Sequence, residues 1–196
     1  MSSLKDIKNR IKSVRNIQQI TKAMKMVAAA KLRHAQDAIT AARPYAQRIE
    51  RVLLDLADSV PEDTHPLLNT RKVKKVLLVV LTSDRGLCGG FNSGIIRKAE
   101  ASLKEYTAEK KEVHFCFIGR KARVYFKNKN VNVFKVYDDV ISKVTFNKAR
   151  EIAELFSQCF LNGEFDEIRF IYNEFKSAIA QDVVDTRFLP VQVQDG

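Results

Sequence analysis

One turn of the sequence carries the residue types that a phosphate-binding loop uses. It reads Thr82-Ser83-Asp84-Arg85-Gly86-Leu87-Cys88-Gly89-Gly90-Phe91-Asn92 and follows the apolar run Val76–Leu81, where a nucleotide-binding α/β domain places its glycine loop. The spacing does not fit, because a GxGxxG string from Gly86 meets Cys88 and Phe91, and no Gly-Lys-Ser/Thr tripeptide is present. The residues therefore predict a tight structural turn with no ligand, in which Gly86 takes a positive φ.

Other reactive side chains are scattered along the chain. Cys88 lies beside Arg85 near an expected helix N-terminus, a setting that can activate a thiol, but no histidine stands close in the sequence to act as a base. We expect a buried or packing cysteine. The pairs Asp138-Asp139 and Asp182/Asp185 are expected to be solvated loop ends. The 3 cysteines lack CxxC spacing, so we expect no zinc site, no catalytic residue and no cofactor.

The elements that must position this turn alternate between strand and helix patterns. Val76–Leu81 is apolar throughout, as in a strand buried on both faces. The other expected strands cover 113–118, 131–137, 168–172 and, more weakly, 183–189, and the expected helices cover 95–106, 122–126 and 149–160. Gly163 is placed to end the last helix. This order predicts a small Rossmann-like α/β domain with a mostly parallel sheet.

The N-terminal part of the chain carries a heptad seam with no partner in the sequence. Its steps alternate four and three, as in a coiled coil, through Ala28, Leu32, Ala35, Ile39, Ala42, Ala46, Ile49, Leu53, Leu56 and Val60. An earlier seam from Leu4 to Val14 joins it out of phase, through Ile17, Ile20 and Met24, so the winding should change there. We expect one long helix that bends near Pro44 and ends around Ser59-Val60-Pro61.

These patterns predict four segments: a shaft helix over 1–60, a linker over 61–72, the α/β domain over 73–190 and a tail over 191–196. No stretch of apolar residues is long enough to span a membrane. Charged residues interrupt the N-terminus every few positions, so we expect it to be mature protein and not a signal peptide.

The net charge of +11 is concentrated at one end of the chain. Residues 1–36 carry nine Lys and Arg side chains against Asp6 alone. A helix of one sign predicts an acidic partner: nucleic acid, an anionic membrane surface or an acidic protein. No aromatic residue precedes Tyr45 and no groove-reading module is evident. A basic nucleic-acid-binding coiled-coil protein with an accessory α/β domain nevertheless stays an alternative hypothesis, and a nucleotide-binding enzyme is a third.

Three strings resemble the gamma subunit of the F-type ATP synthase, the central rotor shaft. They are Ile7–Val14 with Gln19–Lys31, then Ala42-Arg43-Pro44-Tyr45, and above all Thr82–Asn92. The similarity continues more weakly to Phe188-Leu189-Pro190. Family members continue beyond this point into a C-terminal helix, which we expect this sequence, ending at Gly196, to lack. The cysteine-bearing regulatory insertion of the chloroplast members is absent.

The resemblance implies a non-catalytic subunit that couples rotation of the c-ring to ATP synthesis or hydrolysis in the hexamer of alpha and beta subunits. The implied partners are alpha, beta and epsilon subunits and the c-ring, with no nucleic acid, and with the membrane only through the complex. The implied location is peripheral, at the cytoplasmic face of the bacterial inner membrane or at an energy-transducing organelle membrane. Expected contact residues are Arg10, Lys22, Met24, Lys25, Lys31, Arg33, Arg85 and Cys88, with Asp84 holding Arg85 in position.

Overall fold

The computed structural model describes residues 3–59, 65–138, 140–141, 144–177 and 180–191. Contacts divide the chain into two compact units, residues 1–55 and residues 56–196. The expected end of the long helix at Val60-Pro61, part of the expected linker and most of the expected tail lie outside the described residues.

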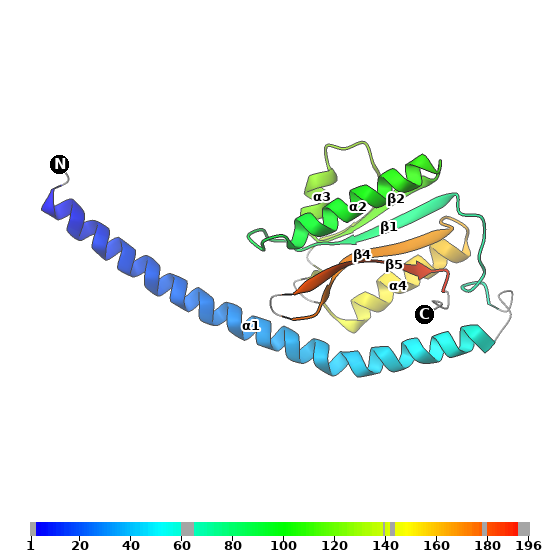
Figure 1. The fold of residues 1–196 in the computed structure, drawn as a ribbon, viewed down its shortest axis with the longest axis horizontal. Coiled ribbons are helices and arrows are strands. Elements are labelled where there is room, and N and C mark those ends of the chain that lie inside the picture. Colours follow the sequence, from blue (N-terminus) through cyan, green and yellow to red (C-terminus); the bar gives the residue numbers. More distant parts are fainter. Residues whose placement is uncertain (1–2, 60–64, 139, 142–143, 178–179, 192–196) are drawn as a thin grey trace. The chain divides into compact units, whose positions relative to one another are not determined.

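The first unit belongs to a single helix, α1, which runs from Leu4 to Ser59 without interruption and so continues a few residues past the boundary of that unit (Figure 1). Its start is capped locally, because the Asp6 carboxylate accepts a hydrogen bond from the Ser3 N–H at 3.0 Å, as in half of a capping box. Pro44 lies inside the helix, as expected. The ribbon curves along its length without breaking (Figure 1).

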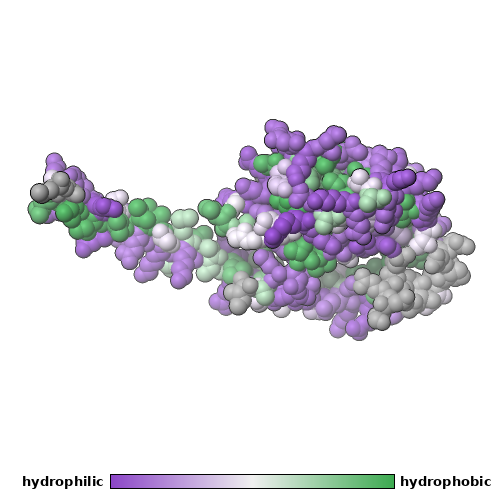
Figure 2. Space-filling model, turned by 45° about the horizontal axis from the view of Figure 1, so that its top comes forward, coloured by the Kyte–Doolittle hydropathy of each residue, from purple (hydrophilic) through white to green (hydrophobic). Residues whose placement is uncertain are grey.

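The apolar seam of α1 is exposed along the whole helix. Its exposed members are Leu4, Ile7, Ile11, Val14, Ile17, Ile20, Met24, Leu32, Ile39, Ile49, Leu53 and Leu56. Figure 2 shows the N-terminal part of α1 with hydrophobic residues along one side and hydrophilic residues along the other. A helix with such a stripe is built to pack against another element.

The second unit is a five-stranded sheet with helices on both faces. Its elements are β1 (Lys75–Leu81), α2 (Phe91–Ala108), β2 (Glu112–Ile118), α3 (Arg120–Phe126), β3 (Asn132–Tyr137), α4 (Phe146–Leu161), β4 (Glu167–Phe175) and β5 (Gln181–Leu189). The strand order is β3-β2-β1-β4-β5, and only β5 is antiparallel to its neighbour. The predicted fold class, a long helix with a mostly parallel α/β sheet, is confirmed.

Strand β1 lies in the middle of the sheet and feeds both halves of the core. Val76, Leu78 and Val80 pack with α2 and α3, while Leu77 and Val79 pack with α4, since successive side chains of a strand point to opposite faces. Figure 1 shows α2 and α3 on one side of the sheet and α4 on the other. Burial on both faces explains why this strand is apolar at every position.

Candidate partner-contact surfaces

The turn between β1 and α2, residues 82–92, is closed by the side chains of Ser83 and Asn92. The Ser83 N–H donates to Asn92 Oδ1 at 3.0 Å. Asn92 Nδ2 donates to Cys88 Sγ at 3.0 Å and to the Arg85 carbonyl at 3.3 Å. The Ser83 hydroxyl also donates to the Arg85 carbonyl, at 2.6 Å. These bonds turn the chain inward at Arg85 and hold Cys88 against the start of α2.

The chain reverses at Leu87, not at Gly86. Leu87 has φ +60° and Gly89 has φ +56°, whereas Gly86 lies outside the positive-φ region, so the expectation for Gly86 is wrong. Because the Arg85 carbonyl faces inward toward Ser83 and Asn92, the reversal falls one residue later. A left-handed conformation costs an L-residue roughly 1–2 kcal/mol, and Leu87 holds it within this hydrogen-bonded turn.

A second contact locks the end of β1 to α3. The Thr82 hydroxyl is buried and accepts a hydrogen bond from the Ala122 N–H at 2.9 Å. Gly119, which precedes α3, has φ +92°, and a Cβ there would lie 1.8 Å from the Thr82 carbonyl oxygen. Only glycine fits this approach, so α3 is held tightly beside the turn.

Asp84 was expected to hold Arg85 in position, and this expectation is wrong. Its Oδ1 accepts a hydrogen bond from the Arg120 N–H at 3.1 Å, and among the described residues no ion pair joins it to Arg85. Asp84 reaches the start of α3 because β1 and β2 pair side by side, so the residues that follow the two strands lie close together. Arg85, Arg120 and Arg123 line a polar hollow of about 350 Å³ with Asp84 and Asp138.

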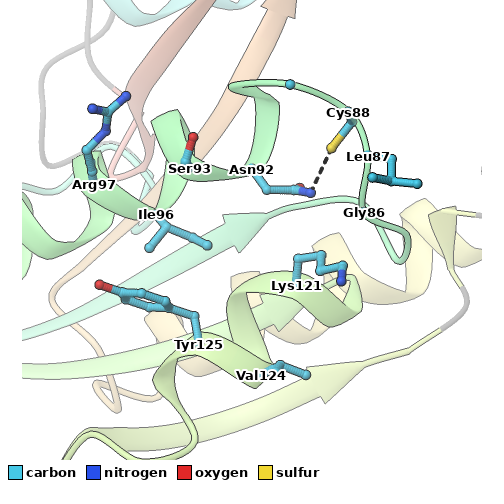
Figure 3. Close-up of a pocket in the computed structure, with 11 residues that line it drawn as sticks. Gly86, Leu87, Cys88, Asn92, Ser93, Ile96, Arg97, Lys121, Val124 and Tyr125 are labelled. Atoms are coloured by element: carbon cyan, nitrogen blue, oxygen red, sulfur yellow. Dashed lines mark hydrogen bonds between the residues drawn. The ribbon is translucent and has the colours of Figure 1, made fainter.

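A larger groove of about 570 Å³ opens between α2 and α3, with the turn at one end (Figure 3). Ile96 and Arg97 line it from α2, and Lys121, Val124 and Tyr125 line it from α3. Val124 is 53% exposed and Tyr125 is 42% exposed. None of its lining residues is acidic. The groove is therefore an open, apolar surface with a cationic rim.

The thiols divide into one exposed and two buried groups. Cys88 is exposed, so of the two expectations, a buried or a packing cysteine, the buried one is wrong; its sulfur accepts a hydrogen bond from Asn92 Nδ2 within the turn. Burial raises the pKa of Cys116 to about 12 and that of Cys159 to about 11. No group of three His, Cys, Asp or Glu side chains that could hold a metal ion occurs in the part of the chain that the structure describes.

Asp185 has a structural role that the sequence did not indicate. Asp185, expected at a solvated loop end, lies within β5 with its side chain only 10% exposed. It accepts hydrogen bonds from Arg169 Nε at 2.7 Å and from the Ser102 hydroxyl at 2.8 Å. Arg169 also pairs with Glu167 at 3.1 Å. Asp138 pairs with Arg123, Asp182 stays exposed, and Asp139 lies outside the described residues.

This network clamps β4 and β5 to α2. The Tyr106 hydroxyl donates to Glu167 Oε1 at 2.8 Å, and burial together with this carboxylate raises the pKa of Tyr106. Burial alone would lower the pKa of Arg169, but its hydrogen bond and charge interaction with Asp185 raise it. The sequence offers one sign of this network, the alternation of charged and apolar residues in β4. It does not show which residues pair with Glu167 and Arg169, since those partners are far away in the chain.

Five of the six basic residues expected to contact a partner lie on α1 and are exposed. They are Arg10, Lys22, Lys25, Lys31 and Arg33. Met24, on the same helix, is 66% exposed. Arg85 and Cys88 are likewise exposed, on the turn of the second unit. The structure thus presents every one of these residues to solvent, on two separate surfaces.

The whole chain matches a known family. The family model described as ATP synthase covers residues 3–196. The ATP synthase gamma chain of Chlorobaculum parvum is 46% identical over 100% of this chain and 68% of its own length. That of Trichlorobacter lovleyi is 43% identical over 100% of this chain and 67% of its own length. This chain therefore spans about two thirds of the length of the curated relatives it matches.

Solved structures agree with the fold. A chain of the Tetrahymena thermophila mitochondrial ATP synthase, from its central stalk and c-ring, matches with a TM-score of 0.64 and 29% identity over 87% of this chain and 72% of its own. A chain of the Euglena gracilis mitochondrial ATP synthase rotor matches the fold with a TM-score of 0.55 at 20% identity, over 94% of this chain and 62% of its own. Among the described residues, no helix combines the length and apolar character needed to cross a bilayer.

Proposed function

This chain belongs to the ATP synthase gamma-chain family, and we propose that it is the central-stalk, rotor part of an F-type ATP synthase. In this role it couples rotation of the c-ring to ATP synthesis or hydrolysis in the hexamer of alpha and beta subunits. The chain itself is non-catalytic, because the nucleotide sites belong to the hexamer. Its contribution is mechanical: an asymmetric shaft that reaches those sites.

The exposed seam of α1 is the observation that carries this proposal. A 56-residue helix that exposes apolar side chains such as Ile11, Ile20, Ile39 and Ile49 needs a cover. In the family, that cover is a C-terminal helix that winds against the N-terminal one, and it belongs to the part of the relatives that this chain does not span. The resulting coiled coil is the shaft.

The charge of α1 fits a partner that is acidic. Lys22, Lys25, Lys31 and Arg33 are exposed and carry one sign. We propose that they face acidic loops of the beta subunits, with Arg10 further along the same helix. Met24, exposed beside Lys25, supplies an adaptable apolar contact to a surface that changes during rotation. Each exposed pair contributes at most about 1 kcal/mol, so the contacts act together.

The sheet domain contributes a second set of contacts to the stalk. We propose that it meets the epsilon subunit and the c-ring, and that Arg85 and Cys88 on its turn face the beta subunits. The complex is peripheral to the membrane, at the cytoplasmic face in a bacterium or at an energy-transducing organelle membrane. The comparisons support this family and give no support to the nucleic-acid alternative.

Joint neutralisation of the basic residues on α1 tests the proposal. A variant with Lys22, Lys25, Lys31 and Arg33 all changed to Gln is introduced into a complete gamma chain and co-expressed with alpha and beta subunits. Assembly and coupled ATP turnover should fall well beyond the effect of any single change. The matched control changes Lys72, Lys104, Lys110 and Lys127, which are exposed on the other unit, to Gln. Unchanged assembly and turnover in the α1 variant would show that the shaft charges have no such role.

A further inference from the structure

Two segments of the chain enter and leave the sheet domain, and a hydrogen bond joins them. The first, residues 65–74, leads into β1, and the second follows β5, which ends at Leu189 (Figure 1). The Val191 N–H donates to the Leu67 carbonyl at 2.9 Å. The side chains of both residues pack against the core on the α4 face of the sheet. A force that reaches the domain along one segment is therefore shared with the other.

Arg71 anchors the first of these segments to α4 and to the loop before β4. Its Nη2 donates to the carbonyls of Phe160 and Phe165 at 2.6 and 2.7 Å. Its Nε pairs with Asp166 at 3.0 Å, and its guanidinium lies 4.4 Å from the centre of the Phe160 ring. Phe160 is in the last turn of α4, where the carbonyl end of a helix favours a cation. Hydrogen bonds from a charged donor are roughly twice as strong as neutral ones.

Asp166 extends this anchor to the start of β1. Its Oδ2 accepts hydrogen bonds from the N–H groups of Lys74 and Lys75, at 2.9 Å each. Its own N–H donates to the Lys75 carbonyl at 2.9 Å, and its side chain is 16% exposed. The pairing of β1 with β4 begins only at Val76. These bonds therefore carry the stiffness of the sheet beyond its edge, into the segment that holds Arg71.

We propose that Arg71 is a positioning residue of the rotor, because it makes the two segments one stiff joint through which the sheet domain and the shaft turn together. The joint consists of Leu67, Arg71, Asp166 and Val191. A first segment held only at Leu67 would yield to torque by bending between that residue and β1. The three acceptors of Arg71 remove this freedom. This inference rests on the proposed function, in which torque passes between the shaft and the sheet domain.

Hydrogen exchange at the Val191 N–H reports the joint directly. Arg71→Met removes the charged donor, so exchange at Val191 should become about tenfold faster or more. Val79, in the middle of β1, is the internal reference, because its N–H exchanges only when the sheet opens. Its rate should change much less than that of Val191.

Two further variants separate the joint from a general loss of stability. Arg71→Lys keeps a cation beside Asp166 but not the planar fork that reaches both carbonyls, so exchange at Val191 should lie between the parent and Arg71→Met. It also carries both measurements if Arg71→Met does not fold. Arg150→Met, on the exposed pair with Glu154, is the matched control and should leave exchange at Val191 unchanged.

The angular motion of an assembled rotor measures the consequence for function. A complete gamma chain with each substitution is assembled with alpha and beta subunits, the hexamer is fixed to a surface, and a bead is attached at the exposed Asn128. Between catalytic steps, the angular variance of the bead is inversely proportional to the torsional stiffness between bead and hexamer. Arg71→Met should raise this variance above that of the parent, and Arg150→Met should not.

Each measurement can overturn the proposal. Equal acceleration of exchange at Val191 and Val79 would show that Arg71 only stabilises the fold as a whole. Unchanged exchange at Val191 in Arg71→Met would show that Arg71 does not hold the joint, and an unchanged angular variance would show that the joint carries no torque. A parent complex that assembles but does not rotate would instead contradict the proposed function itself.

Discussion

α1 and β1 are both rich in aliphatic side chains, yet they use them in opposite ways. On β1, the side chains from Val76 to Val80 are fully buried within the sheet domain. On α1, Ile11 and Ile49 are 49% and 42% exposed. The sheet domain therefore contains its own core, whereas α1 exposes an apolar seam of the kind that packs against another element. The first pattern specifies a fold, and the second specifies an assembly.

The difference also separates two kinds of polar residue. In the sheet domain, Arg169 and Asp185 form a partly buried hydrogen-bonded pair. On α1, the basic side chains are spread along an exposed helix with almost no acidic neighbours in its first half. Mutations in the sheet domain should thus alter its stability, while mutations on α1 should alter association and leave the sheet domain folded.

The largest effect on stability is expected for Gly119→Ala. The new Cβ would lie 1.8 Å from the Thr82 carbonyl oxygen, at a residue with φ +92°. Backbone cannot move aside cheaply there, because β1 and β2 are paired up to Leu81 and Ile118 and the Thr82 N–H donates to the Ile118 carbonyl at 2.9 Å. We expect a loss of about 4 kcal/mol or more in the free energy of unfolding, measured by chemical denaturation of the sheet domain.

Gly86→Ala is the control for this change. Its Cβ would meet only the end of Lys121, at 3.4 Å, and Gly86 has no positive φ. It should cost no more than about 0.5–1 kcal/mol. Equal losses for the two glycine variants would contradict the close approach of Gly119 to Thr82.

Much of this contrast could be predicted from the sequence. The apolar run at Val76–Leu81 and the heptads after Ala28 each follow a periodicity that only one element satisfies. The position of the reversal at Leu87 could not be predicted, since it depends on where Ser83 and Asn92 anchor the turn. A search for glycines alone points to Gly86, because a glycine is the usual residue at positive φ.

The partly buried contacts of Asp185 could not be predicted from the sequence pattern either. Asp185 meets Ser102 and Arg169 only after β5 has folded back beside β4 and α2. Read along the chain, Asp185 is one more acidic residue near the end of the domain. Cys88 shows a related limit: the lack of a histidine nearby in the sequence favoured a buried or packing cysteine, but the folded turn leaves this residue exposed.

The next largest effect is expected for Arg169→Met. The change leaves the side chains of Glu167 and Asp185, which are 5% and 10% exposed, without their shared cation. Asp185 keeps Lys98 at 3.7 Å and Glu167 keeps Arg187 at 3.6 Å, so the cost should be about 1.5–3 kcal/mol, as for hydrogen bonds to charged groups. Lys148→Met, on the more exposed pair with Glu151, should cost about 1 kcal/mol or less. Thermal unfolding of both variants at pH 7 compares them, and similar midpoints would show that the network contributes little.

Ile49→Asp tests the other half of the comparison. It places a charge in the seam of α1, where the parent residue is 42% exposed. We expect concentration-dependent self-association of this chain through α1, and the variant should weaken it by about tenfold, as measured by analytical ultracentrifugation. The unfolding of the sheet domain should not change. Gln47→Asp, on the same helix but off the seam, carries the same helix-propensity cost and should leave association intact.

The smallest effect on stability is expected for a charge pair at the surface of the sheet domain, since the charges of α1 are likewise at the surface. Glu100 on α2 accepts hydrogen bonds from Lys129 and from Tyr125. The hydrogen bond from Lys129 holds the pKa of this carboxyl below its ordinary value. A lowered folded-state pKa stabilises the fold above the unfolded-state pKa, and that stabilisation is lost as the pH falls through the folded-state value.

Glu100→Gln should therefore cost less than about 1 kcal/mol at pH 7, and the difference from the parent chain should shrink below about pH 4. Glu154→Gln, on the more exposed pair with Arg150, is the control and should change stability less. A loss of stability in Glu100→Gln that grows as the pH falls would contradict the prediction, because it would show that the ionised carboxylate does not stabilise the fold.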